Sequence, residues 1–184
     1  SNFSTLTNIN LQINKGDYIG LFGKSGSGKS TFVDIFSGLL VPQSGQILFD
    51  NKNINNYENI WKSKIGYVPQ KIYLNNETIK ENIAFGQHRD DIDDEKVYQA
   101  INKARLNELI ENKIENIENL IGENGINLSG GQIQRLGIAR AIYRDPEILI
   151  FDESTNSLDN ETEQEFMKTV NKLKGEKIIL FISH

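Results

Sequence analysis

Short apolar segments alternate along this chain with stretches that have a helical spacing of apolar side chains. The predicted strands are Tyr18–Phe22, Lys64–Val68, Ile148–Phe151 and Ile178–Ile182, and each runs into polar residues. Strands that alternate with helices favour an α/β fold, in which helices cover both faces of a mostly parallel sheet. Such sheets bind ligands beyond the carboxyl ends of their strands. We therefore expect a functional site where these polar residues fall.

The helical spacing gives three further predictions. One helix follows Lys29 to Gly38, and helical periodicity dominates the middle of the chain from about Thr78 to Ile121. Another helix is predicted from Ser129 to about Tyr143, where Asp145-Pro146 stops it. One more strand, Gln46–Asp50, follows a turn with Pro and Gly, and we expect it in a smaller antiparallel sheet.

Composition narrows the class of protein. The 184 residues, 38% hydrophobic and 24% charged, fit one soluble domain, with room for a subdomain. A net charge of −5 gives no overall basic field for nucleic acid or anionic lipid, and the lack of cysteine excludes disulfides and thiolate metal sites. The apolar runs are strand-sized, shorter than the roughly 20 residues of a membrane helix, and no signal peptide opens the chain. We expect contact with a membrane only through a partner or a further segment.

A phosphate-binding loop follows the first predicted strand. Gly23-Lys24-Ser25-Gly26-Ser27-Gly28-Lys29-Ser30 fits the pattern G-x-x-x-x-G-K-[ST]. Glycines let the backbone amides approach phosphate oxygens, and the following helix adds its positive end. Lys29 is predicted to reach the β- and γ-phosphates and Ser30 to ligate Mg²⁺, with Thr31 also counted among the binding residues. A chance glycine turn is the alternative, which the strand before and the helix after the loop disfavour.

An acidic pair, Asp152-Glu153, follows another apolar strand. Asp152 is predicted to hold Mg²⁺ through water and Glu153 to polarise the attacking water. Taken alone, such a pair would as readily cap a helix. A phosphate loop in the same chain favours the catalytic interpretation.

A second anion-binding segment, Leu128-Ser129-Gly130-Gly131-Gln132, opens a predicted helix. Ser129 is a suitable helix cap, and the two glycines expose backbone amides at the positive end. The segment could be only a helix start. Because one γ-phosphate needs one cradle, a second cradle suggests presentation to the nucleotide of another subunit.

Taken in order, these motifs resemble the ABC ATPase family over essentially all 184 residues. The resemblance rests on the phosphate loop, Gln70 after a strand, Leu-Ser-Gly-Gly-Gln, the acidic pair, Ser157-Leu158-Asp159 and His184. It implies that Gln70 senses Mg²⁺ and the lytic water and couples to a transmembrane domain. It also implies that the segment from Ser129 to Gln132 contacts ATP on the opposite protomer, that Asp159 lies at the dimer seam and that His184 touches the γ-phosphate.

Two segments of the sequence also indicate the subfamily. Glu77–Gly86 resembles the segment after the glutamine in exporter-type domains, and Ile121–Gly125 resembles the exporter loop that faces the membrane helices. Two departures matter. The aromatic residue that stacks on adenine in the family is expected before Ser1, with Phe3 a poor substitute by spacing. The chain also stops at His184, where the family continues, so both ends look truncated.

These inferences combine into one hypothesis. The resemblance implies a P-loop NTPase fold over residues 1–184, with a RecA-like core (about 1–70 and 145–184), a small antiparallel part and a helical subdomain (about 71–144). MgATP hydrolysis would use Lys29, Gln70, Glu153 and His184, with the metal at Ser30, Gln70 and Asp152.

The expected partners are a second ATP-binding domain and a transmembrane domain, fused ahead of this one, at the cytoplasmic side of the membrane, and no nucleic acid. The activity would power transport, most simply export. The alternatives are a non-transport ABC ATPase acting on nucleic acid or ribosomes, and a module that holds ATP without turnover. The motifs do not identify the transported substrate.

Overall fold

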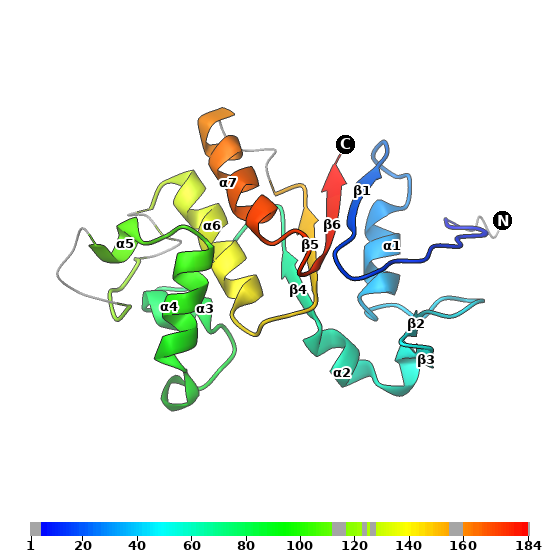
Figure 1. Ribbon diagram of the computed structural model, residues 1–184, viewed down its shortest axis with the longest axis horizontal. Helices are drawn as coiled ribbons and strands as arrows, with labels where there is room; N and C mark the ends of the chain where they lie inside the picture. The colour runs from blue at the N-terminus through cyan, green and yellow to red at the C-terminus, as the bar shows by residue number, and fades with distance from the viewer. Residues whose placement is uncertain (1–4, 112–116, 123–124, 126–127, 155–159, 184) are drawn as a thin grey trace.

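The computed structural model describes residues 5–111, 117–122, 125, 128–154 and 160–183 (Figure 1). Its main sheet has the strand order β1-β6-β5-β4, and every neighbouring pair is parallel. The strands are β1 (Tyr18–Phe22), β4 (Ile65–Val68), β5 (Ile148–Asp152) and β6 (Ile178–Ser183). The four predicted strands are therefore present within one residue of their predicted ends, and the predicted parallel sheet is confirmed.

Strand β5 is the centre of this sheet. Its residues Ile148–Phe151 are at most 1% exposed, as expected for a strand that is covered on both faces and paired on both sides. Asp152, at its carboxyl end, pairs in register with Ile182 of β6. Burial of the apolar run thus determines where the acidic pair leaves the sheet.

Helices cover the sheet on both sides (Figure 1). Helix α1 (Lys29–Phe36) lies on the side of the molecule that also carries the small sheet, and α6 (Gly130–Ile142) lies on the other side. Both begin within one residue of the predicted positions. The predicted small antiparallel sheet consists of β2 (Leu48–Phe49) and β3 (Lys52–Asn53).

The middle of the chain, where the sequence predicts helical periodicity from about Thr78 to Ile121, is largely helical in the structure. It folds into separate short helices, which are α3 (Ile79–Ile83), η2 (Arg89–Asp91), α4 (Asp94–Lys103) and α5 (Glu108–Glu111). Caps and turns cause the breaks. Thr78 and Glu81 form a capping box at the start of α3, whereas Gly86 has a φ of 80° that a helix does not continue.

Several elements were not singled out by the sequence pattern. They are β3, η1 (Ile54–Asn56), α2 (Glu58–Ser63) and α7 (Asn160–Lys172). Helix α7 packs on α6 through the core, in which Phe166 stacks edge-on against Phe151 with ring centroids 5.6 Å apart. Within the part of the chain that the structure describes, no helix is both long enough and apolar enough to cross a membrane.

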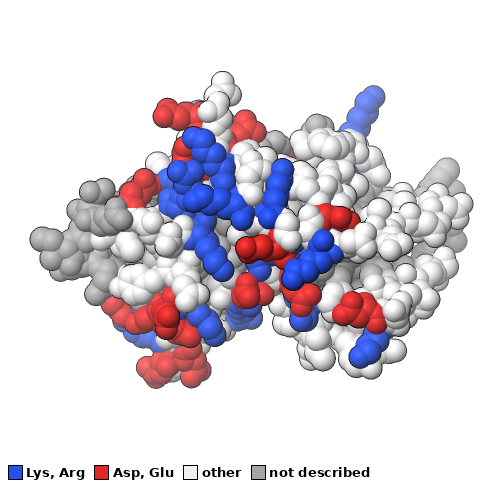
Figure 2. Space-filling model, viewed as in Figure 1, with Lys and Arg blue, Asp and Glu red and all other residues white. Residues whose placement is uncertain are grey.

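Charged side chains stabilise the helical half of the molecule. The nearly buried Lys80 pairs with Glu118 and with Asp94, and Arg89 bridges Glu81 (2.8 Å) and Glu118 (2.6 Å). Hydrogen bonds from Thr78 and the nearby Arg89 lower the pKa of Glu81. Acidic side chains gather at the end of the molecule that holds the start of α4 (Figure 2). This network ties the segment that precedes α6 to α3 and α4.

Close packing of β4 against α6 gives a test of the fold. A Cβ at Gly66 would lie 2.5 Å from the backbone oxygen of Ala141, whereas one at Gly137 would meet side-chain atoms only, those of Ile72 at 2.4 Å and 2.9 Å and of Val68 at 3.6 Å. We expect Gly66→Ala to lower the free energy of unfolding by about 2 kcal/mol or more, because backbone must move. Gly137→Ala should cost much less, since alanine gains about 0.5–1 kcal/mol in a helix. Urea denaturation of both variants checks this, and equal effects would contradict the packing.

Candidate functional site

The phosphate-binding loop turns sharply into α1. Gly28 is the N-cap of this helix, with a left-handed backbone (φ 92°), and a Cβ there would lie 3.0 Å from the side chains of Thr5 and Leu6. Lys29 is only 9% exposed. Its ammonium donates to the carbonyl of Gly23 at 2.5 Å and to that of Lys24 at 3.4 Å. The loop therefore wraps around a nearly buried positive charge.

A cavity of about 260 Å³ joins this loop to the acidic pair. It is lined by Thr5, Ser25, Gly26, Gly28, Lys29, Ser30, Thr31, Asp152, Glu153 and Ile182. Six residues of the segment 25–31 and the acidic pair, far apart in the sequence, thus face one space. The parallel sheet achieves this by ending β1 and β5 at the same edge.

Asp152 is held by a residue that the sequence pattern did not single out. The hydroxyl of Tyr67, on β4, donates to Oδ2 of Asp152 at 2.6 Å. Partial burial raises the pKa of Tyr67 well above its usual range, and the hydrogen bond to the Asp152 carboxylate raises it further. The sequence did place a tyrosine on a predicted strand. Only the register of β4 on β5 shows that this tyrosine lies beside the acidic pair.

Glu153 has an unusual backbone and a defined side-chain contact. Its φ is 47°, a conformation that costs a residue with a side chain about 1–3 kcal/mol. Its N–H donates to the carbonyl of Ile182 at 3.1 Å, and its Oε2 accepts from Nε2 of Gln70 at 3.1 Å. Gln70 and Glu153, predicted separately, therefore lie in direct contact. The buried Ser154, also not predicted, ties the two strand ends through its hydroxyl, which donates to the carbonyl of Val68 at 3.2 Å.

The signature segment, Leu128–Gln132, lies elsewhere. Ser129 and Gln132 form a capping box at the start of α6, as a helix start requires. Ser129 and Gly130 are exposed, Gln132 contacts Glu108, and a Cβ at Gly131 would clash with Thr162 of α7. The residues that line the cavity do not include this segment. The structure thus brings together the loop, Gln70 and the acidic pair, but leaves the signature facing outwards.

Five residues that the sequence singled out lie outside the described residues. They are Ser157, Leu158, Asp159, His184 and Phe3.

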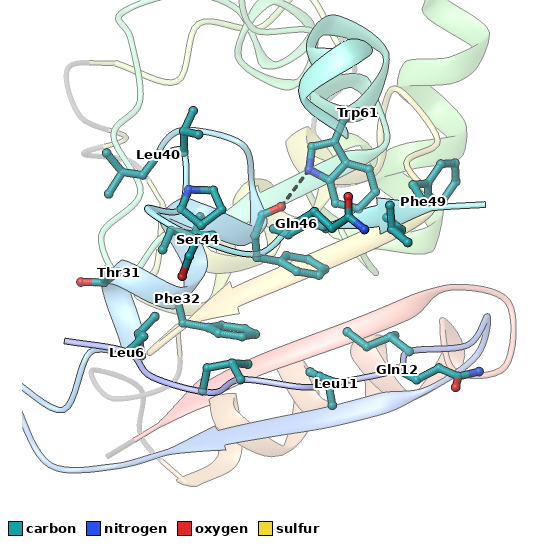
Figure 3. A pocket seen from close by; sticks show the side chains of 18 of the residues that line it. Leu6, Leu11, Gln12, Thr31, Phe32, Leu40, Ser44, Gln46, Phe49 and Trp61 are labelled. Atoms are coloured by element: carbon teal, nitrogen blue, oxygen red, sulfur yellow. Dashed lines mark hydrogen bonds between the residues drawn. The ribbon is translucent and has the colours of Figure 1, made fainter. Parts of the chain in front are cut away.

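A second, larger space lies beside α1. This cavity of about 1090 Å³ is lined by residues 5–13, α1 and residues 40–51, and the view shows Leu11, Phe32 and Trp61 around it (Figure 3). Trp61 is held by its indole N–H, which donates to the carbonyl of Phe36 at 2.8 Å. Asp50 is the one acidic or basic residue among its lining residues. Its chemistry therefore differs from that of the phosphate loop.

A phosphate loop beside an acidic pair, at the edge of a parallel sheet, defines a nucleotide-binding domain of the phosphate-loop class. Residues 6–156 match the family model described as ABC transporter. Because this match spans well over half of the chain, the chain belongs to the ABC transporter family.

Relatives support the same assignment. The alpha-hemolysin translocation ATP-binding protein HlyB of Escherichia coli O157:H7 is 39% identical over 180 residues, 97% of this chain and 25% of that protein. The ATP-dependent lipid A-core flippase of Paraburkholderia xenovorans (strain LB400) is 41% identical over 184 residues, 100% of this chain and 30% of that protein. A solved bacterial Atm1-family ABC exporter with ATP bound has a TM-score of 0.78 at 34% identity, covering 92% of this chain and 30% of that one.

The chain thus spans 25% to 30% of the length of these three relatives. The matches confirm the predicted family, its exporter type and the predicted fold. At the level of the family they also confirm ATP as the ligand and ATPase as the class of enzyme. The roles of single residues stay predictions.

The contact between Tyr67 and Asp152 gives a prediction on pH. Asp152→Asn should lower the pKa of Tyr67, because the carboxylate that repels a phenolate is removed. The pKa should stay above the usual tyrosine value of about 10, since the burial persists. An NMR titration of the tyrosine ring carbons measures it, with Tyr67→Phe identifying the resonance. An unchanged midpoint would contradict the contact.

Proposed function

We propose that this chain binds MgATP and hydrolyses it to drive transport, in the export direction, by a transmembrane domain. The observation that carries the proposal is the single cavity shared by the phosphate loop and Asp152-Glu153, with Gln70 bonded to Glu153. A loop that binds phosphate and a carboxylate that activates water are the two parts that hydrolysis of a phosphoanhydride needs.

Each residue of the cavity has a distinct role in this proposal. The backbone amides from Gly23 to Ser30, together with Thr31, bind the phosphate oxygens. The ammonium of Lys29 neutralises negative charge that develops in the transition state. Glu153 accepts a proton from the attacking water. Gln70 donates to the Glu153 carboxylate and so fixes its orientation. His184 is proposed to contact the γ-phosphate.

The oxygen atoms at the cavity fit Mg²⁺. The hydroxyl of Ser30, the carboxylate of Asp152 and the amide oxygen of Gln70 are hard donors, the type that this ion prefers. Tyr67 engages Oδ2 of Asp152, which leaves Oδ1 to face the cavity or a water. When bound, the ion supplies positive charge to the phosphate oxygens.

The outward signature segment supports a composite site. Ser129, Gly130, Gly131 and Gln132 are proposed to bind the ATP that sits on the loop of a second ATP-binding domain, and Asp159 to lie at the seam. Ser129 and Gly130 are exposed at the positive end of α6, which suits a phosphate that approaches from outside the chain.

The relatives suggest the setting. HlyB is named for translocation of alpha-hemolysin, and the lipid A-core flippase for its lipid. We infer that the transmembrane domain precedes this chain in the same protein, and that the chain works at the cytoplasmic side of the membrane.

The role of Glu153 has a direct test. Glu153→Gln keeps the size of the side chain but removes the base, so ATP turnover should fall about 10²–10⁴-fold. The loss of one negative charge near the phosphates should also strengthen ATP-dependent association of two chains. Phosphate release measures turnover, and light scattering measures association. Glu95→Gln, on the exposed face of α4, is the control. Near-normal turnover in Glu153→Gln would sink the assignment.

A charged side chain introduced into the signature segment tests the composite site. Ser129→Arg should leave ATP binding to each separate chain intact but abolish turnover, because the added side chain blocks the nucleotide of the partner. Mixing it with Lys29→Ala should restore part of the activity, since each mixed pair keeps one complete site. Ser63→Arg, at the end of α2, is the control. A large loss of ATP affinity in separate Ser129→Arg chains would place the signature in the site of its own chain.

A further inference from the structure

One face of α6 holds the segment that follows β4. Gln134, Gly137 and Arg140 are three residues apart and so share a face of the helix. Nε2 of Gln134 donates to the carbonyl of Gln70 at 3.1 Å, and a guanidinium nitrogen of Arg140 donates to the carbonyl of Tyr73 at 2.9 Å. Between them, Gly137 leaves room for Ile72. The segment from Gln70 to Tyr73 is therefore fixed to the helix that begins with the signature.

The same residue also reaches the acidic pair. The side chain of Gln70 donates to Oε2 of Glu153 at 3.1 Å, while its carbonyl accepts from Gln134. A continuous path of hydrogen bonds thus runs from α6 through Gln134 and Gln70 to Glu153. A displacement of α6 changes the position of the Gln70 backbone, and with it the donor that orients the carboxylate.

We infer that Gln134 is a positioning residue for hydrolysis: it places Gln70 against Glu153 and so links the signature helix to the carboxylate. The inference rests on the proposed function, because it requires Glu153 to be the base. Gln134 touches no reacting atom and acts only through Gln70.

The surroundings of Gln134 argue against a purely structural role. The side chain is only 5% exposed. Because the carbonyl of Gln70 can only accept, the amide nitrogen must face it, which leaves Oε1 buried without a hydrogen-bond partner among the described residues. A buried polar atom without a partner lowers stability. An apolar side chain of equal length would remove this cost and also the hydrogen bond to the Gln70 carbonyl. The two effects are of similar size, so stability alone does not favour glutamine here.

The test separates turnover from stability. Gln134→Met keeps the length of the side chain and removes the donor. In the full-length protein we expect turnover at saturating ATP to fall about tenfold, since small misplacements of catalytic groups have effects of this size or larger. The KM for ATP and the melting temperature should not change for the worse. Gln99→Met, on the exposed face of α4, is the matched control and should behave like the parent.

A double-mutant cycle then decides the route. In a Gln70→Ala background, Gln134→Met should cause no further loss of turnover, because the side chain that it positions is already missing. Single-turnover assays with excess protein measure the residual rates. An equal loss in both backgrounds overturns the inference, as does a melting temperature lowered by several degrees.

Two further outcomes are distinguishable. Should Gln134→Met fail to fold, Gln134→Leu repeats the measurement, and failure of both variants shows a structural residue and overturns the inference. If the parent protein does not hydrolyse ATP, the proposed function fails. If it does and Glu153→Gln leaves that rate unchanged, the proposed role of Glu153 as the base fails, and the inference fails with it. If Glu153→Gln abolishes turnover but the double-mutant cycle is additive, the inference alone fails.

Discussion

The parallel pairing of β5 between β4 and β6 is the constraint on which the site depends. It aligns Val68 with Phe151 and Asp152 with Ile182, so the ends of three strands reach one edge of the sheet. A slip of one residue would turn every side chain of β5 to the opposite face. Such a slip would place Asp152 away from Tyr67 and would bury polar atoms in the core. The same strand pairing therefore buries the apolar residues of β5 and positions the acidic pair.

In the site, separate sets of hydrogen bonds hold the positively charged and the negatively charged side chains. The carbonyls of Gly23 and Lys24 accept from the ammonium of Lys29, whereas Tyr67 and Gln70 donate to the carboxylates of Asp152 and Glu153. Neutral dipoles thus hold each charged group in place. Under the proposed function, a bound phosphate would give the ammonium of Lys29 an acceptor that carries a full negative charge in place of these neutral carbonyls.

Much of this arrangement could be predicted from the sequence, and the exceptions have physical causes. Strands such as Ile148–Phe151 and the loop before Lys29 are signalled by consecutive residues, and these predictions are confirmed for the strands. The buried positions Phe166 and Val170 of α7, with Leu173 directly after it, have a helical spacing that was available but not used. Gln134 had no local signal, and the position of Tyr67 on a predicted strand became informative only once the register of the sheet was known. The partners of Tyr67 and Gln134 lie 85 and 64 residues away, and only the register of the sheet and the packing of α6 bring them together.

The position of α6 also explains why two chains would be needed. Its first residues contact Glu108 and Thr162, on α5 and α7, while the phosphate loop lies at the start of α1 beyond the sheet (Figure 1). The buried face of α6, with Leu136, Ile138 and Ala139 at 0% exposure, prevents it from moving to the loop of its own chain without opening the core. Its exposed end does not line the cavity of the phosphate loop, which fits the proposal that it binds a nucleotide held by a second chain. Because the same helix holds Gln70 through Gln134, contact with that second nucleotide would, under the proposed function, act on Glu153, the proposed base of this chain. The signature at the start of α6 and Gln134, about one turn further along, belong to the same helix and would then move together.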